Sequence, residues 1–132
     1  MGWDISFFRR APHAMPRDMD DWLPLGTFDS IVAKLKPCLG EPALTSRGFW
    51  KVQRDGCELN VNIHDENPIT SVSLGVFGRG NPFPSIRSIA AVLECEALDM
   101  VNLELIDLNS NHSDGWSLQK KAEGLFALLR KK

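Results

Sequence analysis

The feature that most constrains this chain is the dipeptide Asp55-Gly56, which separates two runs of alternating side chains. Asp-Gly favours a type I′ turn, because both central residues of that turn need positive φ. A two-residue turn fixes the register of the strands that it joins. Arg54 is therefore expected to pair with Cys57, and each residue outward from there with its counterpart, in a hairpin over residues 48–63.

This register divides the predicted hairpin into two faces, because opposed residues of an antiparallel pair share a face. The face expected to meet a core carries Trp50, Val52, Cys57, Leu59, Val61 and Ile63. The other face carries Phe49, Lys51, Gln53, Glu58, Asn60 and Asn62. An aromatic side chain among amides is typical of an interaction surface, so Phe49, Lys51 and Asn60 are predicted to contact a partner protein. A plain solvated sheet face is the alternative.

Hydrophobic periodicity and turn residues organise the rest of the chain. We expect a strand at 3–8, a surface loop at 9–26, a helix from Thr27 that Pro37 and Gly40 end, a strand at 70–77, a helix capped by Ser85, a strand at 98–108 with a possible break at 101–102, and a last helix at 116–129. The predicted order is β-α-β-β-β-α-β-α. It indicates one α+β domain over residues 1–132, with a mainly antiparallel sheet of four to five strands and two or three helices on one face.

Composition excludes several classes of protein. The chain has 132 residues and a net charge of -2, which is incompatible with a whole-molecule basic field for nucleic acid. It contains no apolar run near the ~20 residues that span a bilayer, and no signal peptide is recognisable. The three cysteines (Cys38, Cys57 and Cys95) are widely spaced, without a C-x-x-C motif. We expect reduced thiols, no metal, no cofactor and a cytoplasmic location.

Acidic residues are concentrated in one part of the sequence. Six acids and no Lys or Arg lie between Ser88 and Gln119. A surface of one sign steers a partner of the opposite sign, so a basic protein is the predicted partner. The acids assigned to this surface are Glu94, Glu96, Asp99, Glu104 and Asp107. The alternative is a solvated face whose acids pair with the basic residues of the last predicted helix.

The tetrapeptide Gly78-Arg79-Gly80-Asn81 lies between a predicted strand and a predicted helix start. Free N–H groups, a helix dipole and a guanidinium can together hold an anion, which makes these four residues an alternative binding site. A tight turn without a ligand is the competing interpretation, because the prolines at 82 and 84 remove two donors. No predicted nucleophile–base pair accompanies the site, and no catalytic residue is assigned.

Four short segments carry a resemblance to a known group of proteins: Trp3-Asp4-Ile5, Gly48-Phe49-Trp50, Gly78-Arg79-Gly80-Asn81-Pro82 and Ala97-Leu98-Asp99. Over residues 1–108 the chain resembles a family of small bacterial single-domain proteins of uncharacterised function. In size, mild acidity and lack of a reactive site it also resembles immunity proteins, which neutralise bacterial toxins. The resemblance to immunity proteins implies a non-catalytic cytoplasmic protein that occludes a toxin. The acidic surface indicates that the occluded toxin domain is basic. The alternatives are a small ligand-binding or enzymatic domain with an anion cradle at Gly78–Pro82 and Arg79, and a homodimer rather than a monomer.

Overall fold

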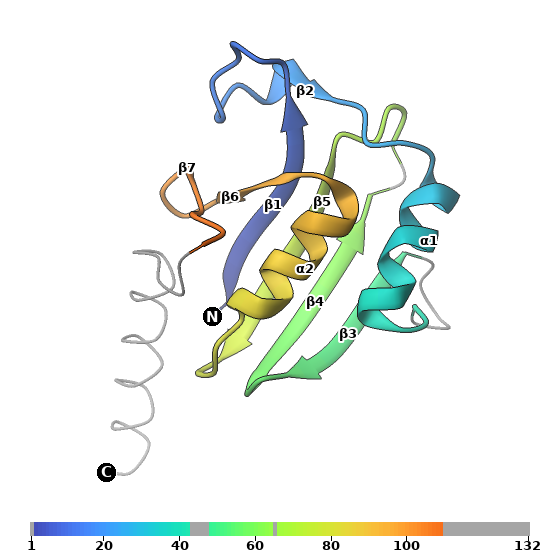
Figure 1. Cartoon of the computed structure of the whole chain (residues 1–132), viewed down its shortest axis with the longest axis vertical. Coiled ribbons are helices and arrows are strands. Elements are labelled where there is room, and N and C mark those ends of the chain that lie inside the picture. Colours follow the sequence, from blue (N-terminus) through green and yellow to red (C-terminus); the bar gives the residue numbers. More distant parts are fainter. Residues whose placement is uncertain (1, 43–47, 65, 110–132) are drawn as a thin grey trace.

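The computed structural model describes residues 2–42, 48–64 and 66–109, which form one curved sheet with two helices against one of its faces (Figure 1). The strands are β1 (Trp3–Arg10), β2 (Trp22–Leu23), β3 (Phe49–Arg54), β4 (Cys57–Ile63), β5 (Ser71–Gly78), β6 (Glu96–Asp99) and β7 (Glu104–Leu105). The helices are α1 (Phe28–Leu39) and α2 (Phe83–Leu93), and a 3-10 turn, η1, spans Met19–Asp21.

The sheet is antiparallel throughout the described residues, in the order β3-β4-β5-β1-β6-β7, and β2 pairs with the end of β1. This confirms the α+β class with a mainly antiparallel sheet. The expected number of four to five strands was wrong, since the sheet has seven. One additional strand, the two-residue β2, lies in the predicted loop, where propensity does not reveal it because tertiary pairing forms it. The other arises because the strand predicted at 98–108 is divided into β6 and β7.

The hairpin of β3 and β4 has the predicted register from Arg54↔Cys57 to Phe49↔Asn62. Asp55 has a φ of 52° and Gly56 a φ of 79°, as a type I′ turn requires. Side chains of β4 alternate between buried and half-buried along the whole strand. The face predicted to meet the core is therefore the face under the helices.

Helix α1 starts as predicted, because the Thr27 hydroxyl accepts the Ser30 backbone N–H at 3.2 Å. Its end at Gly40, with a φ of 82°, is also as predicted. Pro37 does not end the helix, which continues through it to Leu39. Proline is tolerated in this last turn because the carbonyl that it leaves unpaired belongs to an exposed turn of the helix.

Helix α2 begins at Phe83, two residues before the predicted start at Ser85. The Asn81 side chain accepts the Phe83 backbone N–H at 3.2 Å. Pro84 fits the first turn, where its missing N–H would have had no partner inside the helix. The prolines that were expected to precede the helix therefore help to start it.

The main core lies between the helices and the sheet. Trp3, Phe7 and Trp50 are almost fully buried there, together with aliphatic side chains of both helices. The Trp50 indole N–H donates to the Gly40 carbonyl at 2.9 Å and so connects the end of α1 to β3. This core holds the sheet rigid beneath its other face.

A second, smaller cluster lies on the opposite face of the sheet. Phe8 alternates with Phe7 along β1 and stacks on Trp22 with ring centroids 4.5 Å apart. Leu98 and Met100 complete the cluster. The prediction that residues 9–26 form only a surface loop was wrong, because β1 continues to Arg10 and β2 pairs back onto it.

The segment predicted as a strand over 98–108 divides, as the possible break indicated. β6 ends at Asp99, whose carboxylate accepts the Val101 backbone N–H at 2.8 Å, and Leu103 adopts a φ of 55° before β7. This local hydrogen bond ends the strand because it offers the backbone an alternative to the ladder. The helix predicted at 116–129 lies outside the described residues.

Candidate protein-binding face of the sheet

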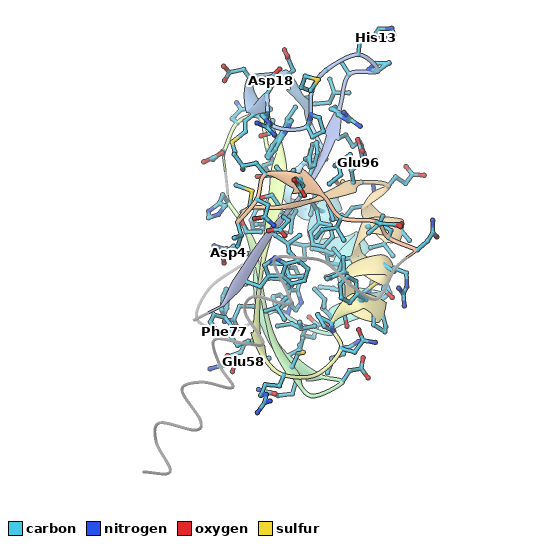
Figure 2. The ribbon with its side chains drawn as sticks, turned by 90° about the vertical axis from the view of Figure 1, so that its left-hand side faces the viewer. Asp4, His13, Asp18, Glu58, Phe77 and Glu96 are labelled. Atoms are coloured by element: carbon cyan, nitrogen blue, oxygen red, sulfur yellow. The ribbon has the colours of Figure 1, made fainter. Side chains whose placement is uncertain are left out.

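Both described helices lie on one face of the sheet, and no described helix covers the other, which we call the open face (Figure 1). Asp4, Glu58 and Phe77 lie on this open face, on the side away from the helices (Figure 2). The open face has two parts of different chemistry. One is the amide-rich half, over β3, β4 and β5, and the other is the apolar half, around β2, β6 and β7.

The amide-rich half contains the polar residues predicted from the hairpin. Lys51 lies 3.4 Å from the Glu58 carboxylate, and the Gln53 amide donates to the same carboxylate at 3.3 Å. Asn60 lies opposite Lys51 on one side and Gly75 on the other. Its Oδ1 atom is buried and has no hydrogen-bond partner. Phe49 is half-buried opposite Asn62.

The apolar half surrounds the cluster of Phe8, Trp22, Leu98 and Met100. Six large apolar side chains of the described residues are clearly exposed: Met15, Met19, Leu23, Val101, Leu103 and Leu105. The first three come from the arm, residues 11–26, and the others from the β6–β7 segment. Leu105 pairs with Leu98 and so shares the open face, whereas Leu23 pairs with Arg9 and points to the helix side of β2. Contacts within the cluster join these two segments. Exposed apolar groups gathered in this way mark interaction sites in soluble proteins.

Acidic side chains accompany the exposed apolar ones. Asp18, Asp20 and Asp21 are exposed on the arm, and Glu104 and Asp107 are exposed on or after β7. The arm has one basic residue other than histidine, Arg17, and residues 100–109 have none. The apolar half therefore has an excess of negative charge.

Two arginines of β1 bind the acidic segment predicted to contact a partner, and Arg10 neutralises one of its acids. Arg10 makes a two-pronged ion pair with Glu96, with Nε 2.7 Å from Oε1 and Nη2 3.1 Å from Oε2. The hydrogen bond that Arg10 donates to Glu96 raises the pKa of the Arg10 guanidinium above its ordinary value, against the opposing effect of desolvation. Arg9 donates to the carbonyls of Leu93 and Glu94 at the C-terminus of α2.

The five predicted acids therefore do not form one surface. Glu104 and Asp107 are exposed beside the apolar residues, and Glu94 is exposed at the end of α2. Glu96 is half-buried in its ion pair, and Asp99 is only 3% exposed, with its carboxylate holding the turn after β6. Asp99 cannot contribute to an exposed acidic surface, because the turn needs the same oxygen.

The predicted anion cradle is filled by the chain itself. The Asn81 backbone N–H donates to the Asp55 carbonyl at 3.1 Å, and the Asn81 side chain already caps α2. A Cβ at Gly80 would lie 1.8 Å from that same Asp55 oxygen, so the loop requires glycine there to approach the hairpin turn. Gly78, with a φ of 103°, makes the bend, and the Arg79 side chain is exposed. The competing interpretation, a tight turn, describes this loop.

A groove of about 320 Å³ lies on the far side of the hairpin turn, between the end of α1 and the start of α2. Its lining includes Cys38, Leu39, Arg54, Pro84, Ser88 and Ile89. The volume is at the lower end of what small-molecule sites occupy. Sequence reasoning missed this groove, because two helix ends and a turn from three distant segments form it.

The described cysteines are free thiols. Cys57 and Cys95 are buried, as predicted for core cysteines, and Cys38 is half-buried. Desolvation raises the pKa of the Cys95 thiol to about 11, although Arg9 nearby acts in the opposite direction. At neutral pH this thiol is therefore protonated and a poor nucleophile.

Comparisons of the chain with protein-family models, with curated proteins and with solved structures give no match. Among residues 2–42, 48–64 and 66–109, no three His, Cys, Asp or Glu side chains gather closely enough to hold a metal ion. No helix in that same part of the chain has the length and apolar character needed to cross a membrane. The candidate site therefore rests on the geometry of the described residues.

The acids and methionines of the arm were missed as site residues at the sequence level. One signal was available, since apolar Trp22, Leu23 and Leu25 interrupt an otherwise acidic, proline-containing segment. Such a group in a loop indicates that the loop packs on something. The sequence does not say on what, because Phe8 is fourteen residues away with irregular chain between.

Proposed function

We propose that this protein is a non-catalytic binding domain that docks a basic partner protein on the open face of its sheet. The observation that carries the proposal is that two adjoining segments, the arm and the β6–β7 segment, carry exposed apolar side chains together with five exposed acids. Interfaces bury an apolar centre and keep charges at the rim, and these segments offer side chains of both kinds. Acidic rims raise the association rate of a basic partner.

The most concrete form of this proposal is a cytoplasmic immunity protein that blocks a toxin by occlusion. The resemblance noted from the sequence supports it, and so does the predicted mechanism, which needs shape and charge but no bond chemistry. Phe49, Lys51 and Asn60 of the amide-rich half would then extend the contact beyond the apolar half. Glu104 and Asp107, rather than the paired Glu96 and the buried Asp99, would supply the acidic contribution of this segment.

Site-specific photo-crosslinking in the cells that encode the chain tests the proposal. A photoreactive amino acid replaces Leu105 or Val101 in the apolar half, and the matched controls replace Ala33 or Ala91, which are exposed on α1 and α2. We expect discrete adducts from positions 101 and 105 and none from positions 33 and 91. Mass spectrometry of the adduct then identifies the partner, and we expect a protein or domain with a basic surface.

Two results would contradict the proposal. Adducts formed only from the helix positions would place the partner on the other side of the molecule. Adducts that contain only a second copy of this chain would replace the partner by a homodimer.

The immunity form has its own test. The reading frame next to the gene is expressed alone and together with this chain, and growth of the host is measured. We expect the neighbouring product to stop growth and this chain to restore it, without restoration by a Leu105→Lys, Val101→Lys double variant. A neighbour that is harmless when expressed alone would contradict the immunity form and leave the binding function to the crosslinking test.

The groove at Arg54 supports a second candidate function, the binding of a small anion-bearing ligand. Its apolar floor, two serines and one guanidinium suit a small carboxylate better than the filled loop at Gly78–Asn81 does. A ligand at 100 times its dissociation constant stabilises a protein by about 2.7 kcal/mol. A thermal-shift screen of small carboxylates and phosphates should then give a shift that Arg54→Gln removes; no shift with any compound would eliminate this candidate.

A further inference from the structure

The Phe77 ring lies flat against the amide-rich half because two glycines make room for it. A Cβ added at Gly2 would lie 2.6 Å from the ring, and one at Gly75 would lie 3.3 Å from it. Both distances are below ordinary van der Waals contact, so side chains at these positions would displace the ring. Phe77 is only partly buried, and the side of its ring away from the sheet is where a ligand can approach.

Acceptor oxygens surround this ring. Glu58 pairs with Phe77 across β4 and β5, and Asp4 pairs with Gly75 across β1 and β5. The position of a Cβ at Gly75 is 3.8 Å from the Asp4 carboxylate, which places that carboxylate beside the ring. The buried, unpartnered Oδ1 of Asn60 belongs to the same row of residues as Gly75 and Asp4. Asp4, Glu58 and Phe77, which Figure 2 labels, lie on one side of the sheet.

One of these carboxylates is uncommitted. Glu58 has Lys51 and Gln53 as partners, whereas Asp4 is exposed and its side chain makes no ion pair or hydrogen bond with the part of the chain that the structure describes. An aromatic ring face attracts a cation placed over it, and a carboxylate beside the ring adds to the attraction. A neutral or anionic group would gain neither.

We infer that the Phe77 ring and the Asp4 carboxylate form a receptor for one basic side chain, an arginine or a lysine, of the partner protein. The guanidinium or ammonium group lies over the ring, and Asp4 forms the ion pair. This inference rests on the proposed function and adds the chemical identity of one contact, which lies in the amide-rich half. It assigns a role to Asp4 and Phe77, which were not among the predicted partner-binding residues.

The test is an NMR titration of the full-length ¹⁵N-labelled protein with three capped tripeptides. Acetyl-Gly-Arg-Gly-amide and acetyl-Gly-Lys-Gly-amide carry the cation, and acetyl-Gly-Gln-Gly-amide is the neutral control. We expect the cationic peptides to shift the amide signals of Asp4, Gly75 and Phe77 in a saturable way, and the glutamine peptide to leave them unchanged. Weak binding is expected from a single contact.

Three variants separate the ring from the carboxylate and from general charge. Phe77→Leu and Asp4→Asn should each weaken binding about two- to fivefold, the size of an exposed cation–π contact or ion pair expressed as affinity. Glu41→Gln removes one exposed negative charge just after α1, on the helix side of the molecule, and should leave the affinity unchanged. Asp4→Asn changes an exposed side chain, so it keeps the test valid if Phe77→Leu disturbs the fold.

The inference is overturned if the glutamine peptide binds as well as the arginine peptide, or if Asp4→Asn binds as tightly as the wild type. It is also overturned if the three signals shift on dilution of the protein alone, since a second copy would then occupy the ring. Crosslinking at positions 101 and 105 involves neither Asp4 nor Phe77. Adducts there without binding of cationic peptides would reject this receptor and keep the proposed function, and the reverse outcome would do the opposite.

Discussion

The two halves of the open face differ in how their side chains meet solvent. A sheet with helices on one side has a second face that must either be covered or tolerate water. The amide-rich half tolerates water, with side chains that satisfy one another, such as Lys51 and Gln53 on Glu58. The apolar half is covered in part by its own arm, through Trp22 on Phe8, and still exposes large apolar groups such as Leu105 and Val101.

This difference indicates which part of the face contributes to stability and which contributes to binding. The Phe8–Trp22 cluster is a structural element, because its members are buried. The apolar groups around it contribute little to the fold, because water reaches them. Exposed apolar side chains that do not stabilise the fold are expected to contact a partner.

The largest predicted effect tests whether the cluster is a second core. Trp22→Ala removes a buried ring from the stack with Phe8 and should lower the free energy of unfolding by about 3–5 kcal/mol. Asn62→Ala, on the amide-rich half, should change it by less than about 0.5 kcal/mol. Urea denaturation of both variants measures the contrast. Equal losses would show that the two halves do not differ as described.

The second effect concerns the pH dependence of stability and the exclusion of water from Cys95, which directly precedes β6. Burial raises the pKa of the Cys95 thiol from 9.0 to about 11. The unfolded chain therefore loses this proton first, and stability that is fully present below pH 9 is lost as the pH rises toward 11. The loss attributable to Cys95 should reach about 2–3 kcal/mol, at 1.36 kcal/mol for each pH unit.

Urea denaturation between pH 8 and 11 provides the measurement, with Cys95→Ala as the reference because other groups titrate in the same range. The wild type should lose more stability than the variant over this window. Equal losses of stability with pH in the wild type and in Cys95→Ala would mean that water reaches the Cys95 thiol in the folded protein.

A smaller effect distinguishes binding from stability within the amide-rich half. Gly2→Ala should displace the Phe77 ring from Gly75, since the new Cβ would lie 2.6 Å from it. The half-exposed ring can turn away, so the free energy of unfolding should change by less than about 1 kcal/mol. The nuclear Overhauser contact between the ring and Gly75 should disappear. A contact of unchanged intensity would show that the backbone, not the ring, gives way.

The smallest effect concerns the exposed apolar groups themselves. Leu105→Lys and Val101→Lys should each change the free energy of unfolding by less than about 0.5 kcal/mol, because water already reaches these side chains. Thermal and urea denaturation measure it. Losses above about 2 kcal/mol would assign both residues to the structural cluster and remove the main support for a docking surface.

Local chemistry made the hairpin predictable. Asp55-Gly56 fixes a register over six residue pairs, and the amide-rich face follows from that register without further information. Thr27 likewise identifies the start of α1 through a contact only three residues long. Where turn and cap residues specify the geometry, a single sequence suffices.

The receptor at Phe77 and the apolar half could not be predicted in the same way, because non-local pairing forms them. Phe77 meets Gly2 only because β1 inserts between β5 and β6, and the sequence does not state that order. Asp99 resembled its acidic neighbours in sequence, yet the turn after β6 buries it. One local signal was present in Gly75, since a glycine inside a strand marks a close approach.

The most direct test of a docking surface on the open face is the affinity of the crosslinked partner, measured by isothermal titration calorimetry. The Leu105→Lys, Val101→Lys double variant places two positive charges in the apolar half, and Ala33→Lys places one on the helix layer as a control. We predict that the double variant binds at least about tenfold more weakly, which corresponds to ~1.4 kcal/mol, while Ala33→Lys binds like the wild type. Equal affinities for the wild type and the double variant would contradict the account.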